Sequence, residues 1–140
     1  AVMKNILVVG GRNTCGSIVA AGLMAKCLAE KGRSDTAVAS AGIMAFPGIP
    51  AEEEAVKTLE KNGISGSFCS SALTKKQVEE ADLIITMTRK IKEAILAKFP
   101  GKEGLVLWVY EGEEAPEEDR GCEKLEERIP GICEKLCEKL

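Results

Sequence analysis

Four short runs of apolar, often β-branched residues recur along the chain, with helix-like segments between them. The runs cover residues 4–9, 36–40, 82–87 and 105–110. When strands alternate with helices, right-handed crossovers bring the strands together in a parallel sheet with helices on both faces. The sequence therefore predicts an α/β fold with residues 4–9 as the central strand. A length of 140 residues fits one domain, 1–140.

The segments between the runs carry signals for the ends of helices. Ser17 is expected to cap the first helix and Gly32 to end it. Pro50 is expected to open the second helix, and Thr74 has the spacing of a capping box. Near the end of the chain, Pro130 falls inside an apolar helical stripe, so we expect it to kink or split that helix.

The amino-acid composition excludes some catalytic mechanisms and some classes of binding partner. The chain has no histidine, so a mechanism has neither an imidazole base nor an imidazole metal ligand. The formal net charge of −3 lacks the basic excess of a general nucleic-acid surface, so no nucleic acid is expected as a partner. No apolar run reaches the roughly 18 residues of a membrane span. We therefore expect a soluble, cytoplasmic protein without a membrane partner.

The six cysteines are expected to be free thiols, because a domain of this size needs no disulfide staples and the spacings contain no CxxC pair. Three of them, Cys122, Cys133 and Cys137, fall in the last helical segment. Three thiols without a fourth ligand at a standard spacing are weak evidence for zinc, so buried apolar residues are the better interpretation. No metal and no cofactor is expected.

The loop after the first run is the candidate site. It consists of Gly10, Gly11, Arg12, Asn13, Thr14, Cys15, Gly16 and Ser17. Ligands of open parallel sheets bind beyond the carboxyl ends of the strands, and successive N–H groups before a helix can cradle an anion. The sequence thus indicates a site for phosphate or another small anion, although a glycine-rich turn is also ordinary packing geometry.

Several blocks of residues carry a family likeness. They are Asn13-Thr14-Cys15 with Ser17, Ser40-Ala41-Gly42 with Phe46-Pro47-Gly48, and residues 80–88. In these blocks the chain resembles the low-molecular-weight protein tyrosine phosphatases, which include protein-arginine phosphatases and related arsenate reductases. The resemblance covers roughly residues 4–110. It implies a phosphotyrosine protein phosphatase I-like fold, a four-stranded parallel sheet flanked by helices.

The same resemblance implies that three catalytic positions are replaced. The family loop begins with a nucleophilic Cys and ends with a phosphate-binding Arg, where this chain has Gly10 and Gly16. The family's general acid is an Asp before a Pro, where this chain has Ala115. A phosphocysteine mechanism needs a thiolate and a guanidinium clamp, and glycine supplies neither. No residue is therefore assigned as catalytic, and Cys15, which matches the family's second loop cysteine, stays as an alternative nucleophile.

Other positions of the resemblance concern the shape of the site. Asn13 and Ser17 match family loop positions, and Ser40 matches the serine that braces that Asn in the family. Phe46 matches the aromatic wall of the family's substrate cleft. Arg12 is the one charge inside the loop, and we expect it to face solvent rather than replace the lost guanidinium.

The expected function is therefore that of a pseudophosphatase, a catalytically inactive family member that acts by binding an anion or an unidentified protein partner. A phosphatase or redox enzyme with altered chemistry at Cys15 and a regulatory subunit are the alternatives. Residues 111–119 contain six carboxylates. We interpret them as a solvated acidic loop, with a face for a cationic partner as the other interpretation.

Overall fold

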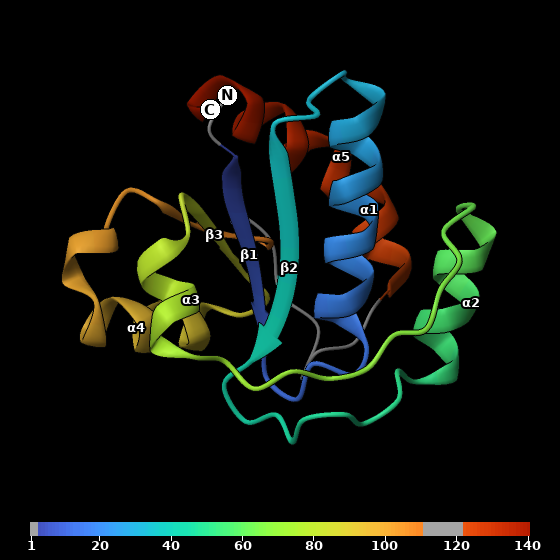
Figure 1. Ribbon diagram of the computed structural model, residues 1–140, viewed down its shortest axis with the longest axis horizontal. Helices are drawn as coiled ribbons and strands as arrows, with labels where there is room; N and C mark the ends of the chain where they lie inside the picture. The colour runs from blue at the N-terminus through green and yellow to red at the C-terminus, as the bar shows by residue number, and fades with distance from the viewer. Residues whose placement is uncertain (1–2, 111–121) are drawn as a thin grey trace.

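The computed structural model describes residues 3–110 and 122–140, and it confirms the predicted α/β fold (Figure 1). The strands are β1 (Lys4–Gly10), β2 (Thr36–Gly42), β3 (Leu83–Thr86) and β4 (Val106–Trp108). They form one parallel sheet in the order β2-β1-β3-β4, so β1 is an interior strand as predicted. The carboxyl ends of β1 and β2 meet at the lower edge of the molecule in Figure 1.

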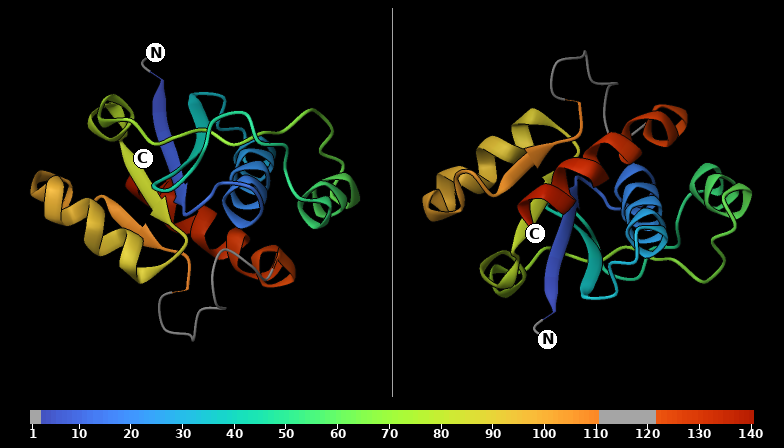
Figure 2. Two further views of the ribbon diagram at one scale, coloured as in Figure 1. Left: turned by 90° about the horizontal axis from the view of Figure 1, so that it is seen from below. Right: turned by 90° about the horizontal axis from the view of Figure 1, so that it is seen from above.

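Helices cover both faces of the sheet. They are α1 (Gly16–Glu30), α2 (Glu53–Lys61), α3 (Lys75–Glu80), α4 (Arg89–Lys98) and α5 (Cys122–Lys139), with a short 3-10 helix η1 (Pro100–Lys102). Figure 2 shows α1 and α5 on one side of the sheet and α3 and α4 on the other. Alternate side chains of β1 point to opposite faces of the sheet. Ile6 and Val8 pack with α1 and α5, and Leu7 and Val9 pack with α3 and α4. This explains why residues 6–9 of the first run are continuously apolar.

Two of the predicted helix ends are confirmed. Gly32 has a φ of +73°, and its N–H donates to the carbonyl of Ala29 at 3.0 Å, which ends α1 in a left-handed turn. Thr74 and Gln77 form the predicted capping box at the start of α3. Both signals lie within a few residues of the helix end that they define.

The predicted starts of α1 and α2 are wrong. Helix α1 begins one residue before Ser17, with Cys15 at the N-cap, and the Ser17 hydroxyl instead accepts a hydrogen bond from Asn13. Helix α2 begins at Glu53, because Pro50 lies in an extended segment that bridges to Cys69. At Ser17 a side-chain contact within the same loop replaces the capping bond, and at Pro50 the pairing with a distant segment outweighs the local start signal.

Pro130 was predicted to kink or split the last helix, and the split is wrong, since α5 continues through Pro130. Leu125 and Ile129 before the proline and Ile132 and Leu136 after it are all buried, so packing on both sides holds the helix together.

The thiol of Cys133 lies in the core, and burial raises its pKa to about 12, with a hydrogen bond to Cys27 as the next cause. It stays neutral near pH 7 and packs as an apolar residue. Within the described part of the chain, no three His, Cys, Asp or Glu side chains are grouped to hold a metal ion. None of the helices described there is long and apolar enough to cross a membrane.

Candidate functional site

The loop between β1 and α1 packs backbone against backbone on the segment that follows β2. The N–H of Ile43 donates to the carbonyl of Gly10 at 3.0 Å, and the N–H of Met44 donates to the carbonyl of Gly11 at 2.9 Å. A Cβ atom at Gly42 would lie 2.3 Å from the Gly11 oxygen, so this approach requires glycine. The two loops therefore hold each other at the carboxyl edge of the sheet.

Asn13 braces the loop from the inside. It is fully buried and has a φ of 58°, in the left-handed region that Asn tolerates better than most residues. Its Nδ2 donates to Oγ of Ser17 at 2.8 Å and to Oγ of Ser40 at 3.1 Å, and its Oδ1 accepts from the N–H of Ser71 at 2.8 Å. One amide thus links the loop to α1, to β2 and to the segment before α3.

The backbone of the loop presents donors at the start of a helix. Among residues 3–110 and 122–140, the N–H groups of Arg12, Asn13 and Thr14 have no hydrogen-bond acceptor. Such groups bind water or a ligand. Helix α1 begins at Gly16 without an acidic residue in its first turn, so the positive end of its dipole faces the loop. This arrangement suits a small anion.

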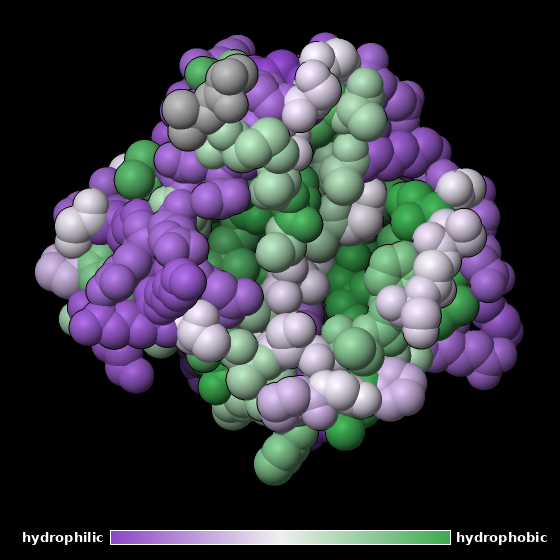
Figure 3. Space-filling view, viewed as in Figure 1, coloured by the Kyte–Doolittle hydropathy of each residue, from purple (hydrophilic) through white to green (hydrophobic). Residues whose placement is uncertain are grey.

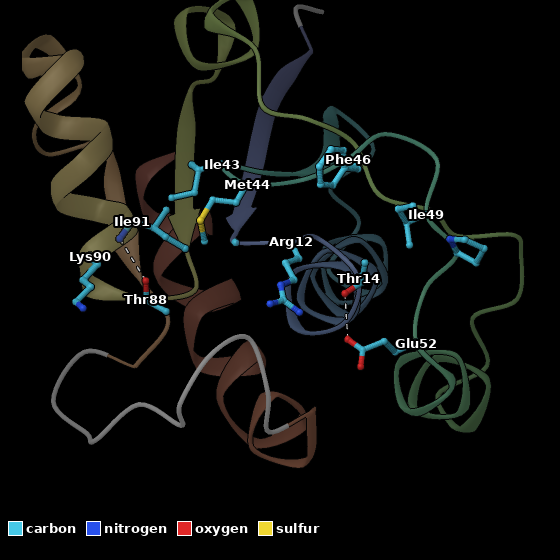
Figure 4. Close-up of a pocket in the computed structure, with 12 residues that line it drawn as sticks. Arg12, Thr14, Ile43, Met44, Phe46, Ile49, Glu52, Thr88, Lys90 and Ile91 are labelled. Carbon is cyan, nitrogen blue, oxygen red and sulfur yellow. Dashed lines mark hydrogen bonds between the residues drawn. The ribbon is translucent and has the colours of Figure 1, made fainter.

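A cleft of about 810 Å³ opens beside the loop (Figure 4). Three segments supply its walls: residues 11–14 of the loop, residues 43–52 after β2, and residues 88–91 at the start of α4. Phe46 is one of the residues that line this cleft. The sequence analysis missed Met44, Ile49 and Lys90, although Lys90 follows a strand beside β1 and the carboxyl-end rule could have found it.

The charged side chains of the cleft differ in whether they have a hydrogen-bond or ion-pair partner among the described residues. Glu52 accepts a hydrogen bond from the hydroxyl of Thr14 at 3.0 Å, and its N–H donates to the Thr14 carbonyl at 2.8 Å. Arg12 is exposed, as predicted, but it lines the cleft together with Lys90. Neither cation forms an ion pair with any of the residues that the structure places.

The remaining predicted site residues contribute no side chain to the cleft. Gly10 ends β1 and Gly16 begins α1, and both are buried. Cys15 is 2% exposed and packs in the core cluster with α1 and α5. This position does not favour Cys15 as a nucleophile toward a ligand in the cleft. The predictions for Ala115 and for residues 111–119 lie outside the described residues.

Replacing the brace, Asn13→Ala, is expected to lower the free energy of unfolding by about 2–4 kcal/mol. The variant loses all three hydrogen bonds, leaves the Ser71 N–H without its partner, and places Ala in a left-handed conformation. Urea denaturation measures the change. Asn5→Ala is the matched control, because the Asn5 side chain is exposed, and it is expected to cost less than about 1 kcal/mol. Equal losses in the two variants would contradict the bracing role.

Comparisons with known proteins agree with this geometry. The family described as low molecular weight phosphotyrosine protein phosphatase matches residues 5–139. The chain is 37% identical over 95 residues to the protein-arginine-phosphatase of Bacillus subtilis (strain 168), covering 68% of this chain and 63% of that protein. It is 37% identical over 114 residues to a probable low molecular weight protein-tyrosine-phosphatase, EpsP, of Ralstonia solanacearum, covering 81% of this chain and 75% of that protein. A crystal structure of a YwlE mutant from Bacillus subtilis matches with a TM-score of 0.82 and 27% identity, over 95% of this chain and 98% of that one. The chain therefore belongs to the low molecular weight phosphotyrosine protein phosphatase family.

Proposed function

We propose that this chain is a pseudophosphatase: it keeps the family's loop as a binding site and does not hydrolyse phosphate esters. The observation that carries the proposal is the contrast within the loop. Asn13 keeps its three hydrogen bonds, while Gly10 and Gly16, which stand where the resemblance places the nucleophile and the clamp, bring no side chain. A fixed loop without reactive groups binds but does not transfer a phosphoryl group.

The ligand of the loop, in this proposal, is phosphate or another small anion held by backbone N–H groups. The unbonded N–H groups of Arg12, Asn13 and Thr14 and the start of α1 support it. Arg12 is exposed and four positions before Gly16, so it adds charge at the mouth of the cleft rather than a bidentate clamp. Affinity for inorganic phosphate is therefore weak, with a dissociation constant of about 1 mM or higher.

A turnover assay tests the proposal. With p-nitrophenyl phosphate and with phosphoarginine, the purified chain is expected to show no rate above that of buffer, because no cysteine thiol lines the cleft among the described residues. Cys15→Ala is the matched variant and is expected to behave identically. Robust turnover that Cys15→Ala abolishes would refute the proposal and make Cys15 the nucleophile.

Titration of the same sample with inorganic phosphate, followed by ¹H–¹⁵N NMR, shows whether the loop still binds. Amide shifts confined to residues 11–17 are the expected result. Shifts elsewhere, or none at phosphate concentrations well above the expected dissociation constant, would contradict the anion site.

A further inference from the structure

The segment after β2 exposes a dense group of large apolar side chains. Ile43, Met44, Phe46 and Ile49 are 41%, 69%, 79% and 48% exposed. In the described part of the chain, the other exposed large apolar residues are Met3 and Leu105, which precede β1 and β4 at the opposite end of the sheet. Figure 3 shows apolar side chains protruding at the lower edge of the molecule, where this segment runs. Single apolar residues are normal on a surface, whereas a contiguous group marks an interaction site.

The exposure does not come from a loosely held backbone. At the start of the segment, the N–H groups of Ile43 and Met44 donate to the loop between β1 and α1. At its end, the N–H of Gly48 donates to the Ser70 carbonyl at 2.9 Å and the N–H of Ile49 donates to Oγ of Ser70 at 2.9 Å. The apolar side chains are therefore presented by a fixed backbone, which lowers the entropic cost of binding a partner.

Positive charge lies beside the apolar side chains in the cleft. Figure 4 shows Arg12 between Met44 and Thr14, and Lys90 on the other side of Met44. Neither cation has an ion-pair partner among the described residues, while the carboxylate of Glu52 is already held by Thr14. Exposed Phe, Met and Arg side chains in one patch are the composition of a protein interface, and the two cations favour an anionic group on the partner.

We propose that this cleft binds a segment of a partner protein in which an apolar side chain stands next to an Asp or Glu. The proposal rests on the binding role proposed above and specifies the chemistry of the partner. The apolar side chain covers Met44 and Phe46, and the carboxylate pairs with Arg12 or Lys90. A polypeptide fits better than a small molecule because the apolar side chains stand out on the surface, where a small ligand would leave most of their area in water.

Selection from a display library of random, unphosphorylated peptides on the intact chain tests this directly. Enriched peptides are expected to carry an apolar residue beside an acidic one. Fluorescence anisotropy then measures the affinity of the most enriched peptide. We expect Phe46→Ser to weaken it by about 10-fold or more, and Met44→Ser and Lys90→Gln by about 3- to 10-fold each. The matched controls Met3→Ser and Lys92→Gln lie outside the cleft and are expected to leave it unchanged.

Four results would overturn the inference: no enrichment, enriched peptides without acidic residues, equal binding by Phe46→Ser, or a strong preference for the phosphotyrosine form of the peptide. Circular dichroism of each variant shows that lost binding is not lost folding. The pseudophosphatase proposal fails by a different result, turnover of aryl phosphate. Absence of turnover together with absence of selected peptides refutes the peptide site alone.

Discussion

Two substitutions made together, Gly10→Cys and Gly16→Arg, are expected to give this chain phosphatase activity toward p-nitrophenyl phosphate. The new thiolate attacks phosphorus and forms a phosphocysteine as the bond to p-nitrophenolate breaks, and the new guanidinium holds the phosphoryl oxygens. The bracing of Asn13 already keeps the loop in place. Since Ala115 supplies no general acid, p-nitrophenyl phosphate suits the test because its leaving group needs no proton.

The expected rate of the double variant exceeds that of either single variant by about 100-fold, because nucleophile and clamp act as a unit. Mass spectrometry of the quenched reaction should detect one phosphoryl group on the protein. Adding Cys15→Ala to the double variant is the matched control and is expected to preserve the activity. A double variant with an unchanged melting temperature but no phosphoenzyme would show that the loop does not keep a competent shape.

The fold follows from local signals, which is why the sequence predicts it. A continuous apolar run such as residues 6–9 indicates a strand that is buried on both faces, and Gly32 ends a helix through its own backbone conformation. Pro50 fails as a helix start because its conformation depends on Cys69 in another segment. Ser17 fails as a cap because its hydroxyl bonds to Asn13 instead.

The sequence predicts only those residues of the site whose side chains belong to a recognisable motif. The resemblance points to Asn13 and Ser40, whose side chains meet across 27 positions of the sequence. It does not indicate that Ser71 contacts Asn13, because that contact is made by the backbone N–H of Ser71 from 58 positions away and does not depend on its side chain. Met44 and Lys90 belong to no motif, and only the folded chain brings their segments to one edge of the sheet.

Gly42→Ala is expected to be the most damaging single substitution in the site. A methyl group there would lie 2.3 Å from the carbonyl oxygen of Gly11 and 3.0 Å from Cβ of Asn13. These neighbours cannot rotate away as a flexible side chain would, because Gly11 accepts from Met44 and Asn13 is fully buried. Gly42 itself is tied on both sides of its Cα, since its N–H donates to Ser71 and its carbonyl accepts from Leu73. Either β2 or the loop has to shift.

The expected loss in the free energy of unfolding for Gly42→Ala is about 3 kcal/mol or more, which lowers the melting temperature by about 10 °C. Gly131→Ala is the matched control: its Cβ meets no atom within 4 Å, and it lies in α5, so Ala should stabilise that helix by about 0.5–1 kcal/mol. Thermal unfolding followed by circular dichroism measures both. Because the clash falls on the loop itself, Gly42→Ala should also abolish the amide shifts that phosphate causes in residues 11–17. A stable Gly42→Ala variant that binds phosphate normally would mean that the two loops are free to separate, and the fixed anion site would have to be abandoned.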